Sequence, residues 1–179
     1  MDYRQSEWGR HQEHGADVGL IPQDDAGALV YRLECRNSGT SSNHVQFWGP
    51  CPDWDTIGNA NALTFRFRAR CTVPFRMAQI TVRRGRLPWT VYGASGGGPA
   101  LTTEWQDVSV RMNLVARGDN PRLHLNLGSL LPAGAVLDFQ PLELLATSCT
   151  VAASLPVDVG NIIFDHGEAC GWKKWGVDQ

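Results

Sequence analysis

The stretch Thr103-Glu-Trp-Gln-Asp-Val108, followed by Pro121-Arg-Leu-His-Leu-Asn-Leu-Gly128 and Gly134-Ala-Val-Leu-Asp-Phe-Gln-Pro-Leu142, decides the fold. Apolar and polar residues alternate within these short runs, and Gly or Pro residues separate the runs. Alternation with a period of two is typical of strands that bury one face, and closely spaced turn residues favour antiparallel connections. The stretch therefore predicts antiparallel strands of an all-β sandwich.

Similar alternation extends on either side of this stretch. In Thr64-Phe-Arg-Phe-Arg-Ala-Arg70 it places Phe65, Phe67 and Ala69 on one face and three arginines on the other. Loops rich in Gly, Ser, Asn and Pro separate the runs, and neither an amphipathic helix nor an internal repeat is evident. The economical prediction is a jelly-roll β-sandwich of two antiparallel sheets. Its predicted strands are 28–36, 44–48, 62–71, 76–84, 88–93, 105–115, 121–127 and 135–145.

Composition excludes several classes of protein. The chain has 179 residues, enough for a sizeable core, and a formal net charge of −2, which does not indicate nucleic-acid binding. No apolar run approaches the roughly 20 residues needed to span a bilayer. The polar N-terminus is not a signal peptide, so a secreted protein would have lost its signal or would carry it outside this sequence.

The five cysteines do not match a metal site or a redox motif. They are Cys35, Cys51, Cys71, Cys149 and Cys170, with no Cys-x-x-Cys pair among them. Cys35 and Cys71 are expected to be small apolar strand residues. A disulfide, for instance between Cys149 and Cys170, stays open.

The order of Trp105, the Arg122-to-Gly128 strand, a Gly turn and a closing Val136-x-Asp138 strand resembles jelly-roll carbohydrate-binding modules of the family 4/9 type, which are galactose-binding-like β-sandwiches. The resemblance covers roughly 27–145. It implies a buried Trp105 and a domain that binds glycans without cleaving them. It also implies an appendage of a secreted, multi-modular polysaccharide-acting protein.

The resemblance leaves the chain ends open to two interpretations. Residues 1–145 are predicted to form the domain and 146–160, rich in small and polar residues, a linker. Residues 161–179 begin with Asn161-Ile-Ile-Phe-Asp-His-Gly167, which resembles the opening strand of such modules. This tail either starts a second module or docks back as a missing first strand, in a circular permutant or a swapped dimer. The N-terminus is expected to run from Trp8 to the strand after Gly27 with no strand between them.

Sugar binding needs flat aromatic faces and planar polar groups. The aromatic candidates are Trp48, Trp54, Trp89 and Tyr92, which lie in or beside turn-rich segments. The polar candidates lie opposite the apolar positions of their predicted strands. They are Gln46, Arg111, Asn113, His124 and Asn126, which would line one concave surface beside Trp48 if their strands are neighbours.

A structural Ca²⁺ is also implied by the resemblance, held by a carboxylate from the opening segment and another from the closing strand. The matching residues are Asp165 and Asp138. They can share an ion only if the tail folds back onto the sandwich.

Catalysis has little support in the sequence. There is no defensible pair of acid and base carboxylates and no nucleophile motif, and Gly96-Gly-Gly98 lacks the residues of a phosphate-binding loop. The prediction is a non-catalytic module that binds a polysaccharide or oligosaccharide beside a neighbouring catalytic module. One alternative is a scaffold domain that mediates domain or subunit contacts without binding sugar. A catalytic jelly roll such as a polysaccharide lyase ranks last.

Overall fold

The structure is a computed structural model that describes residues 3 and 6–147. Within them no helix is long and apolar enough to cross a membrane. Strands dominate, with one short helix, α1 (Trp54–Ile57), and a 3-10 turn at Ser42–His44. The strands are β1 (Gly9–Gln12), β2 (Asp17–Asp25), β3 (Ala28–Asn37), β4 (Val45–Pro50), β5 (Ala62–Cys71), β6 (Phe75–Arg76), β7 (Ile80–Arg84), β8 (Val91–Ser95), β9 (Ala100–Leu101), β10 (Gln106–Leu114), β11 (Pro121–Asn126) and β12 (Val136–Thr147).

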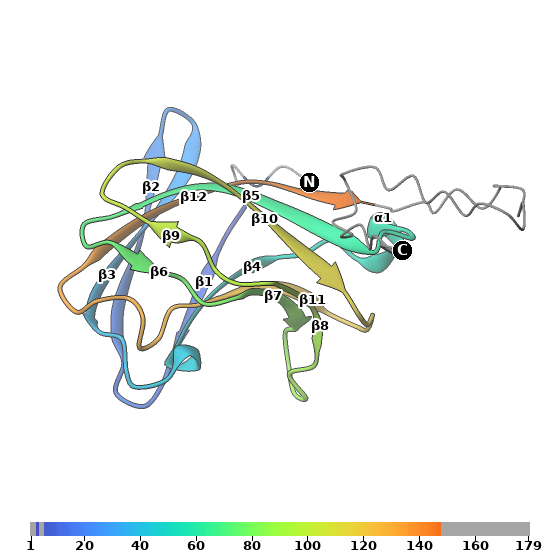
Figure 1. Cartoon of the computed structure of the whole chain (residues 1–179), viewed down its shortest axis with the longest axis horizontal. Coiled ribbons are helices and arrows are strands. Elements are labelled where there is room, and N and C mark those ends of the chain that lie inside the picture. Colours follow the sequence, from blue (N-terminus) through green and yellow to red (C-terminus); the bar gives the residue numbers. More distant parts are fainter. Residues whose placement is uncertain (1–2, 4–5, 148–179) are drawn as a thin grey trace, which may run out of the picture.

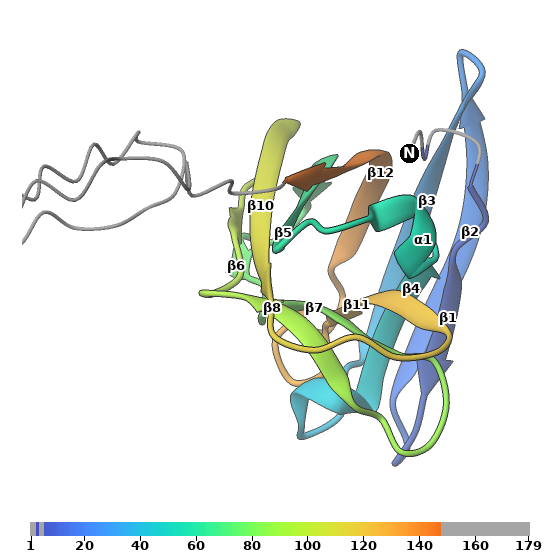
Figure 2. The same cartoon turned by 90° about the vertical axis from the view of Figure 1, so that its right-hand side faces the viewer.

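The prediction of an all-β sandwich is confirmed. Ten strands follow the order β1-β4-β11-β7-β8-β10-β5-β12-β3-β2, every neighbouring pair is antiparallel, and β6 and β9 form a small separate pair. Because β8 pairs with both β7 and β10, the hydrogen-bonded ladder is continuous. The sheet folds over on itself, so that β4, β11 and β7 face β10, β5 and β12 (Figures 1 and 2).

Aromatic rings from both layers fill the core between them. Phe47 of β4 lies 5.3 Å, centroid to centroid, from Phe139 of β12, and Trp8 lies 5.6 Å from Phe65 of β5. All four side chains are almost fully buried. The alternation predicted for β5 is confirmed, because Phe65, Phe67 and Ala69 are buried while Arg66 and Arg68 between them are exposed. Burial of these large rings supplies much of the stabilisation of the sandwich.

The N-terminal prediction is wrong, because β1 and β2 lie between Trp8 and Gly27. β1 forms the edge beside β4, and β2 forms a hairpin with β3 at the opposite edge. β2 contains Gly19 and Pro22 and buries only Val18 fully, so its alternation is weak. An edge strand tolerates a proline because one side of it makes no ladder hydrogen bonds. β12 continues to Thr147, and the rest of the predicted linker and the tail 161–179 lie outside the described residues.

The assignment of Trp105 to the core is also wrong. Trp105 is only partly buried, and the guanidinium carbons of Arg68 and Arg70 lie 5.4 and 5.0 Å from its ring centroid. Val110 and Met112 of β10 point into the core, so residues at odd positions of this segment face outward. Strand parity therefore places Trp105 on the arginine face of β5.

Two of the cysteines behave as expected. Cys35 and Cys71 are buried free thiols, and burial raises the pKa of each. Both therefore act as small apolar residues of their strands. Cys149 and Cys170, the pair considered for a disulfide, lie outside the described residues.

Candidate functional site

A groove of about 450 Å³ lies on the outer face of the layer formed by β1, β4, β11 and β7. Aromatic and polar side chains line it, from these strands and from the loops that join them. The lining residues are His11, Glu13, Asn43, Gln46, Trp48, Arg83, Gly85, Trp89, Asn120, Arg122 and His124. We call the hollow lined by these residues the groove.

The pairing of β4 with β11 explains why several predicted residues meet here. His124 lies opposite Trp48, and Asn126 lies opposite Gln46. The leucines between and beside the two β11 residues are fully buried, so the polar side chains face the other way. The structure thus brings together Gln46, Trp48 and His124 on one surface. Asn126 is beside them on the same strand face but does not line the groove.

Trp48 forms a partly exposed wall of the groove. Its ring lies over Gly9 of β1, where even a Cβ atom would overlap the ring. The guanidinium carbon of Arg122 is 5.5 Å from the ring centroid on the neighbouring strand. Beyond Trp48 lies a second hollow of about 490 Å³, which shares Trp48 and Arg122 with the groove. The two hollows therefore adjoin at these two side chains.

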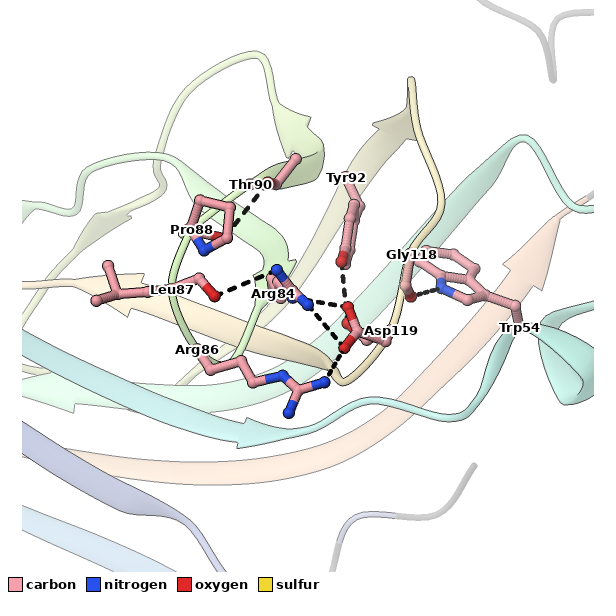
Figure 3. Close-up of polar contacts among 9 residues, drawn as sticks. All are labelled: Trp54, Arg84, Arg86, Leu87, Pro88, Thr90, Tyr92, Gly118 and Asp119. Carbon is pink, nitrogen blue, oxygen red and sulfur yellow. Dashed lines mark hydrogen bonds and ion pairs between the residues drawn. The ribbon is translucent and has the colours of Figure 1, made fainter.

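Trp89 lies on the hairpin between β7 and β8, and it is 48% exposed. The guanidinium carbon of Arg83 lies 5.6 Å from its ring centroid. The hairpin is tied to the loop before β11, because Arg84 donates a hydrogen bond to Asp119 at 2.9 Å and Arg86 pairs with the same carboxylate (Figure 3). Hydrogen bonds from Arg84 and Arg86 lower the pKa of Asp119 to about 2. This hairpin end is thus held in place beside the groove.

His124 forms part of the floor of the groove and is only 4% exposed. Burial, reinforced by the positive charges of Arg83 and Arg122, lowers its pKa to about 3. The imidazole is therefore neutral at ordinary pH, with one N–H donor and one acceptor nitrogen. Neither nitrogen has a hydrogen-bond partner within the part of the chain that the structure describes. Buried polar atoms are normally paired, so this ring is suited to meet a ligand.

Trp54 and Tyr92 are placed away from the groove. The Tyr92 side chain is buried, and its hydroxyl donates to the backbone oxygen of Asp119 at 2.9 Å (Figure 3). Trp54 packs edge-on against Tyr92 and donates its indole N–H to the backbone oxygen of Gly118. These two rings support the loop between β10 and β11. Neither ring lines the groove, so their role as ligand contacts stays a prediction.

Arg111 and Asn113 also lie apart from the groove. Both are exposed on β10, and Arg111 Nε donates to Asn113 Oδ1 at 3.4 Å. β7 and β8 separate β10 from β11 in the sheet order, so the two side chains belong to another surface. The single concave surface proposed for all five polar candidates is therefore not formed.

Comparison with known structures identifies the fold. No protein-family model matches the chain, and no curated protein matches its sequence. Solved structures do match, among them a CBM4 module with a TM-score of 0.60 and 20% identity over 82% of this chain and 92% of that one. The domain resembles the β-sandwich carbohydrate-binding modules.

Two other carbohydrate-binding modules match at lower identity. The N-terminal cellulose-binding domain of β-1,4-glucanase C from Cellulomonas fimi has a TM-score of 0.53 and 15% identity, over 78% of this chain and 88% of that one. The CBM22-1 xylan-binding domain of Xyn10C from Paenibacillus barcinonensis has a TM-score of 0.51 and 11% identity, over 82% and 92%. At such identities the likeness establishes the shared fold.

The calcium ion expected for this type of carbohydrate-binding module does not fit the surroundings of Asp138. Arg32 donates to Asp138 from Nε at 2.8 Å and from Nη2 at 3.2 Å, and Arg70 Nε donates at 3.0 Å. Two cations already satisfy both carboxylate oxygens, and they would repel Ca²⁺. Among the described residues no three His, Cys, Asp or Glu side chains gather as a metal site would require. The other expected ligand, Asp165, lies outside those residues, so its role stays a prediction.

Several groove residues were missed by the sequence analysis. They are His11, Glu13, Asn43, Arg83, Gly85, Asn120 and Arg122. Arg122 could have been found, because it shares the strand face of His124. His11 and Glu13 could not, because β1 was not predicted. Arg83 was not among the candidates, and the structure places it against Trp89.

Proposed function

We propose that this domain is a non-catalytic carbohydrate-binding module whose groove binds a polysaccharide chain. One observation carries the proposal: two partly exposed tryptophans, Trp48 and Trp89, line a hollow that is otherwise polar. Exposed aromatic faces bury the CH faces of pyranose rings, and amides and guanidinium groups bind hydroxyls in fixed directions.

The groove provides both kinds of contact. Gln46, Asn43 and Asn120 supply amide groups along it, and His124 supplies a donor and an acceptor in its floor. The second hollow adjoins the groove at Trp48 and Arg122, so a chain that crosses these side chains would contact both hollows. This arrangement favours an internal segment of a polysaccharide over a chain end. Such open and hydrated sites bind with modest affinity.

The structural comparisons support the same proposal. The similar solved domains include one described as cellulose-binding and one described as xylan-binding. An arabinose-bound α-L-arabinofuranosidase also matches, with a TM-score of 0.51 and 14% identity, over 80% of this chain but 25% of that one. We further propose that the domain belongs to a secreted, multi-modular polysaccharide-acting protein, beside a catalytic module. For the tail 161–179, a second module and a first strand that docks back, in a circular permutant or a swapped dimer, both remain proposals.

The test is affinity electrophoresis of the purified chain through gels that contain soluble polysaccharides. Trp48→Ala and Trp89→Ala should each weaken retention, by about 30-fold in dissociation constant if the ring contributes about 2 kcal/mol. Trp105→Ala is the matched control, because this partly buried tryptophan lies outside the groove. Circular dichroism and thermal unfolding would verify that each variant is folded. Undiminished binding in both groove variants would contradict the assignment of the two rings.

The scaffold alternative has one specific observation in its favour. Leu87, Trp89 and Val91 of the β7–β8 hairpin are exposed by 72%, 48% and 44%. Neighbouring exposed apolar side chains mark contact surfaces in many proteins. No retention by any glycan, from a folded sample, would favour this hairpin as a contact with another domain.

A further inference from the structure

We infer that the groove recognises an anionic sugar unit, bound through Arg83 and Arg122 by its uronate carboxylate or its sulfate ester. This inference rests on the proposed function and specifies the class of polysaccharide. It follows from the placement of two guanidinium groups that no carboxylate of the described chain neutralises.

The two arginines lie directly opposite each other. Arg83 of β7 and Arg122 of β11 are partners in the antiparallel register, and both side chains line the groove. Like charges at facing positions of neighbouring strands destabilise a sheet. Burial lowers the pKa of Arg83, although its guanidinium remains charged at ordinary pH. An anion bound between the two guanidinium groups would offset their repulsion and stabilise the sheet.

Carboxylates neutralise many of the other arginines, but not these two. Seven arginines of the described residues form ion pairs with Asp or Glu, and six do not: Arg10, Arg76, Arg83, Arg111, Arg117 and Arg122. Among these six, Arg83 and Arg122 are the two that line the groove. Arg83 Nε is buried and has no hydrogen-bond partner among those residues. The nearby Asp119 is already held by Arg84 and Arg86. The groove thus retains positive charge in a chain whose formal net charge is −2.

The arginines are held in place beside the aromatic walls. Arg122 lies over Trp48 and Arg83 over Trp89, at 5.5 and 5.6 Å from the ring centroids. Contact with an aromatic face restricts a guanidinium without neutralising it. Gly85 leaves room for this arrangement, because a Cβ at this position would lie 2.7 Å from Arg122 Cγ. A sugar bound in the groove would therefore meet an aromatic ring and an arginine together.

His124 is the second, independent observation that indicates a ligand. It is almost fully buried in the floor of the groove, on the same strand face as Arg122, and both of its nitrogens lack partners within the described residues. Its neutral ring can donate one N–H to an anionic oxygen. The one carboxylate of the groove, Glu13, accepts a hydrogen bond from Asn43 at 3.3 Å and lies 3.8 Å from His11 Nε2. Glu13 is therefore engaged with residues of the β1 side of the groove.

Matched pairs of polysaccharides test the inference. Polygalacturonate is compared with its fully methyl-esterified form, and dextran sulfate with dextran, in affinity gels at constant ionic strength. The wild-type chain should be retained at least tenfold more strongly by one anionic polymer than by its uncharged counterpart, as charge-assisted hydrogen bonds predict. A preference within the first pair identifies a carboxylate, and a preference within the second identifies a sulfate.

Substitutions separate a local site from the overall charge of the chain. Arg83→Met and Arg122→Met should each reduce the anionic preference by about tenfold. Arg36→Met removes the same charge from an exposed position on β3 and should leave the preference unchanged. An equal loss in Arg36→Met would overturn the inference, because it would show that only net charge matters. The wild-type comparison remains decisive if a groove variant does not fold.

The outcomes also separate this inference from the proposed function. Equal retention by the charged and uncharged members of both pairs would overturn the anionic ligand but leave a carbohydrate-binding groove. Retention by no polysaccharide, neutral or charged, would overturn both.

Discussion

Removing the carboxylate charge of Asp138 should destabilise the domain more than any other change of a single ionisable group in the β5–β12 layer. Asp138 is 5% exposed, and it lies between Arg32 of β3 and Arg70 of β5 in the registers of β12. Burial alone would raise its pKa, but hydrogen bonds and charge from the two arginines outweigh burial, so the pKa is lowered. The carboxylate therefore joins three strands.

The loss of stability can be judged from the two arginines, Arg32 and Arg70, that Asp138→Asn leaves without a carboxylate. Breaking a fully buried ion pair costs about 3–5 kcal/mol. The side chains of Arg32 and Arg70 are 34% and 42% exposed, so water would partly solvate them after the change. We expect a loss of about 2–3 kcal/mol in the free energy of unfolding. Asp107→Asn is the control, because Asp107 is 77% exposed and pairs with a single arginine, Arg68, at 3.2 Å; it should cost less than about 1 kcal/mol.

The assay is urea unfolding of the wild type and both variants from pH 3 to pH 7. A carboxyl group whose pKa is lower in the folded state stabilises the fold above its unfolded value of about 3.9. That contribution is lost as the pH falls through the folded pKa. The difference between wild type and Asp138→Asn should therefore be constant from pH 5 to pH 7 and decrease below about pH 4. A difference below 1 kcal/mol at pH 7 would refute the ion-pair account.

The same variant tests the calcium hypothesis. If the arginines alone hold Asp138, the loss in stability is the same with excess Ca²⁺ as with a chelator. If Asp138 and Asp165 share an ion, binding stabilises the folded wild type further, and the loss is larger with excess Ca²⁺ than with a chelator. A loss that does not depend on Ca²⁺ would therefore contradict the calcium hypothesis, and a loss that grows with Ca²⁺ would support it.

Two further predictions concern the groove and the loop beside it. The imidazole of His124, with its pKa lowered to about 3, should show no NMR titration between pH 5 and pH 8; a midpoint near 6.5 would contradict its burial. As the pH falls from 7 to 5, the unfolded chain protonates His124 and the folded chain does not, so the free energy of unfolding should decrease by about 2 kcal/mol. In urea unfolding, His124→Gln should remove that part of the pH dependence. Trp54→Ala should cost about 2–3 kcal/mol of unfolding free energy, since the half-buried ring packs on Tyr92, yet retain glycan binding per folded molecule. If Trp54→Ala instead loses glycan binding without losing stability, Trp54 contacts the ligand.

The sequence was informative where strands are central and regular. In β5 and β11 every second residue is buried, so the alternation in sequence predicted both the strand and its outward face. It was uninformative at the edges, because β1 has four residues and β2 contains Gly19 and Pro22. Edge strands bury less and tolerate such residues, which weakens the pattern. The β1 side of the groove was therefore hidden, although Trp48 and His124 were identified.

Alternation assigns a face to each residue, but a binding site also depends on which strands are neighbours. Arg111 and His124 both point outward from their strands, yet β7 and β8 separate β10 from β11. Conversely, Arg83 and Arg122 lie 39 residues apart and become facing partners only in the register of β7 and β11. Their mutual repulsion is thus a property of long-range pairing, which local propensity does not encode. The facing arginines Arg83 and Arg122, which indicate an anionic ligand, are for this reason evident in the fold but not in the local sequence pattern.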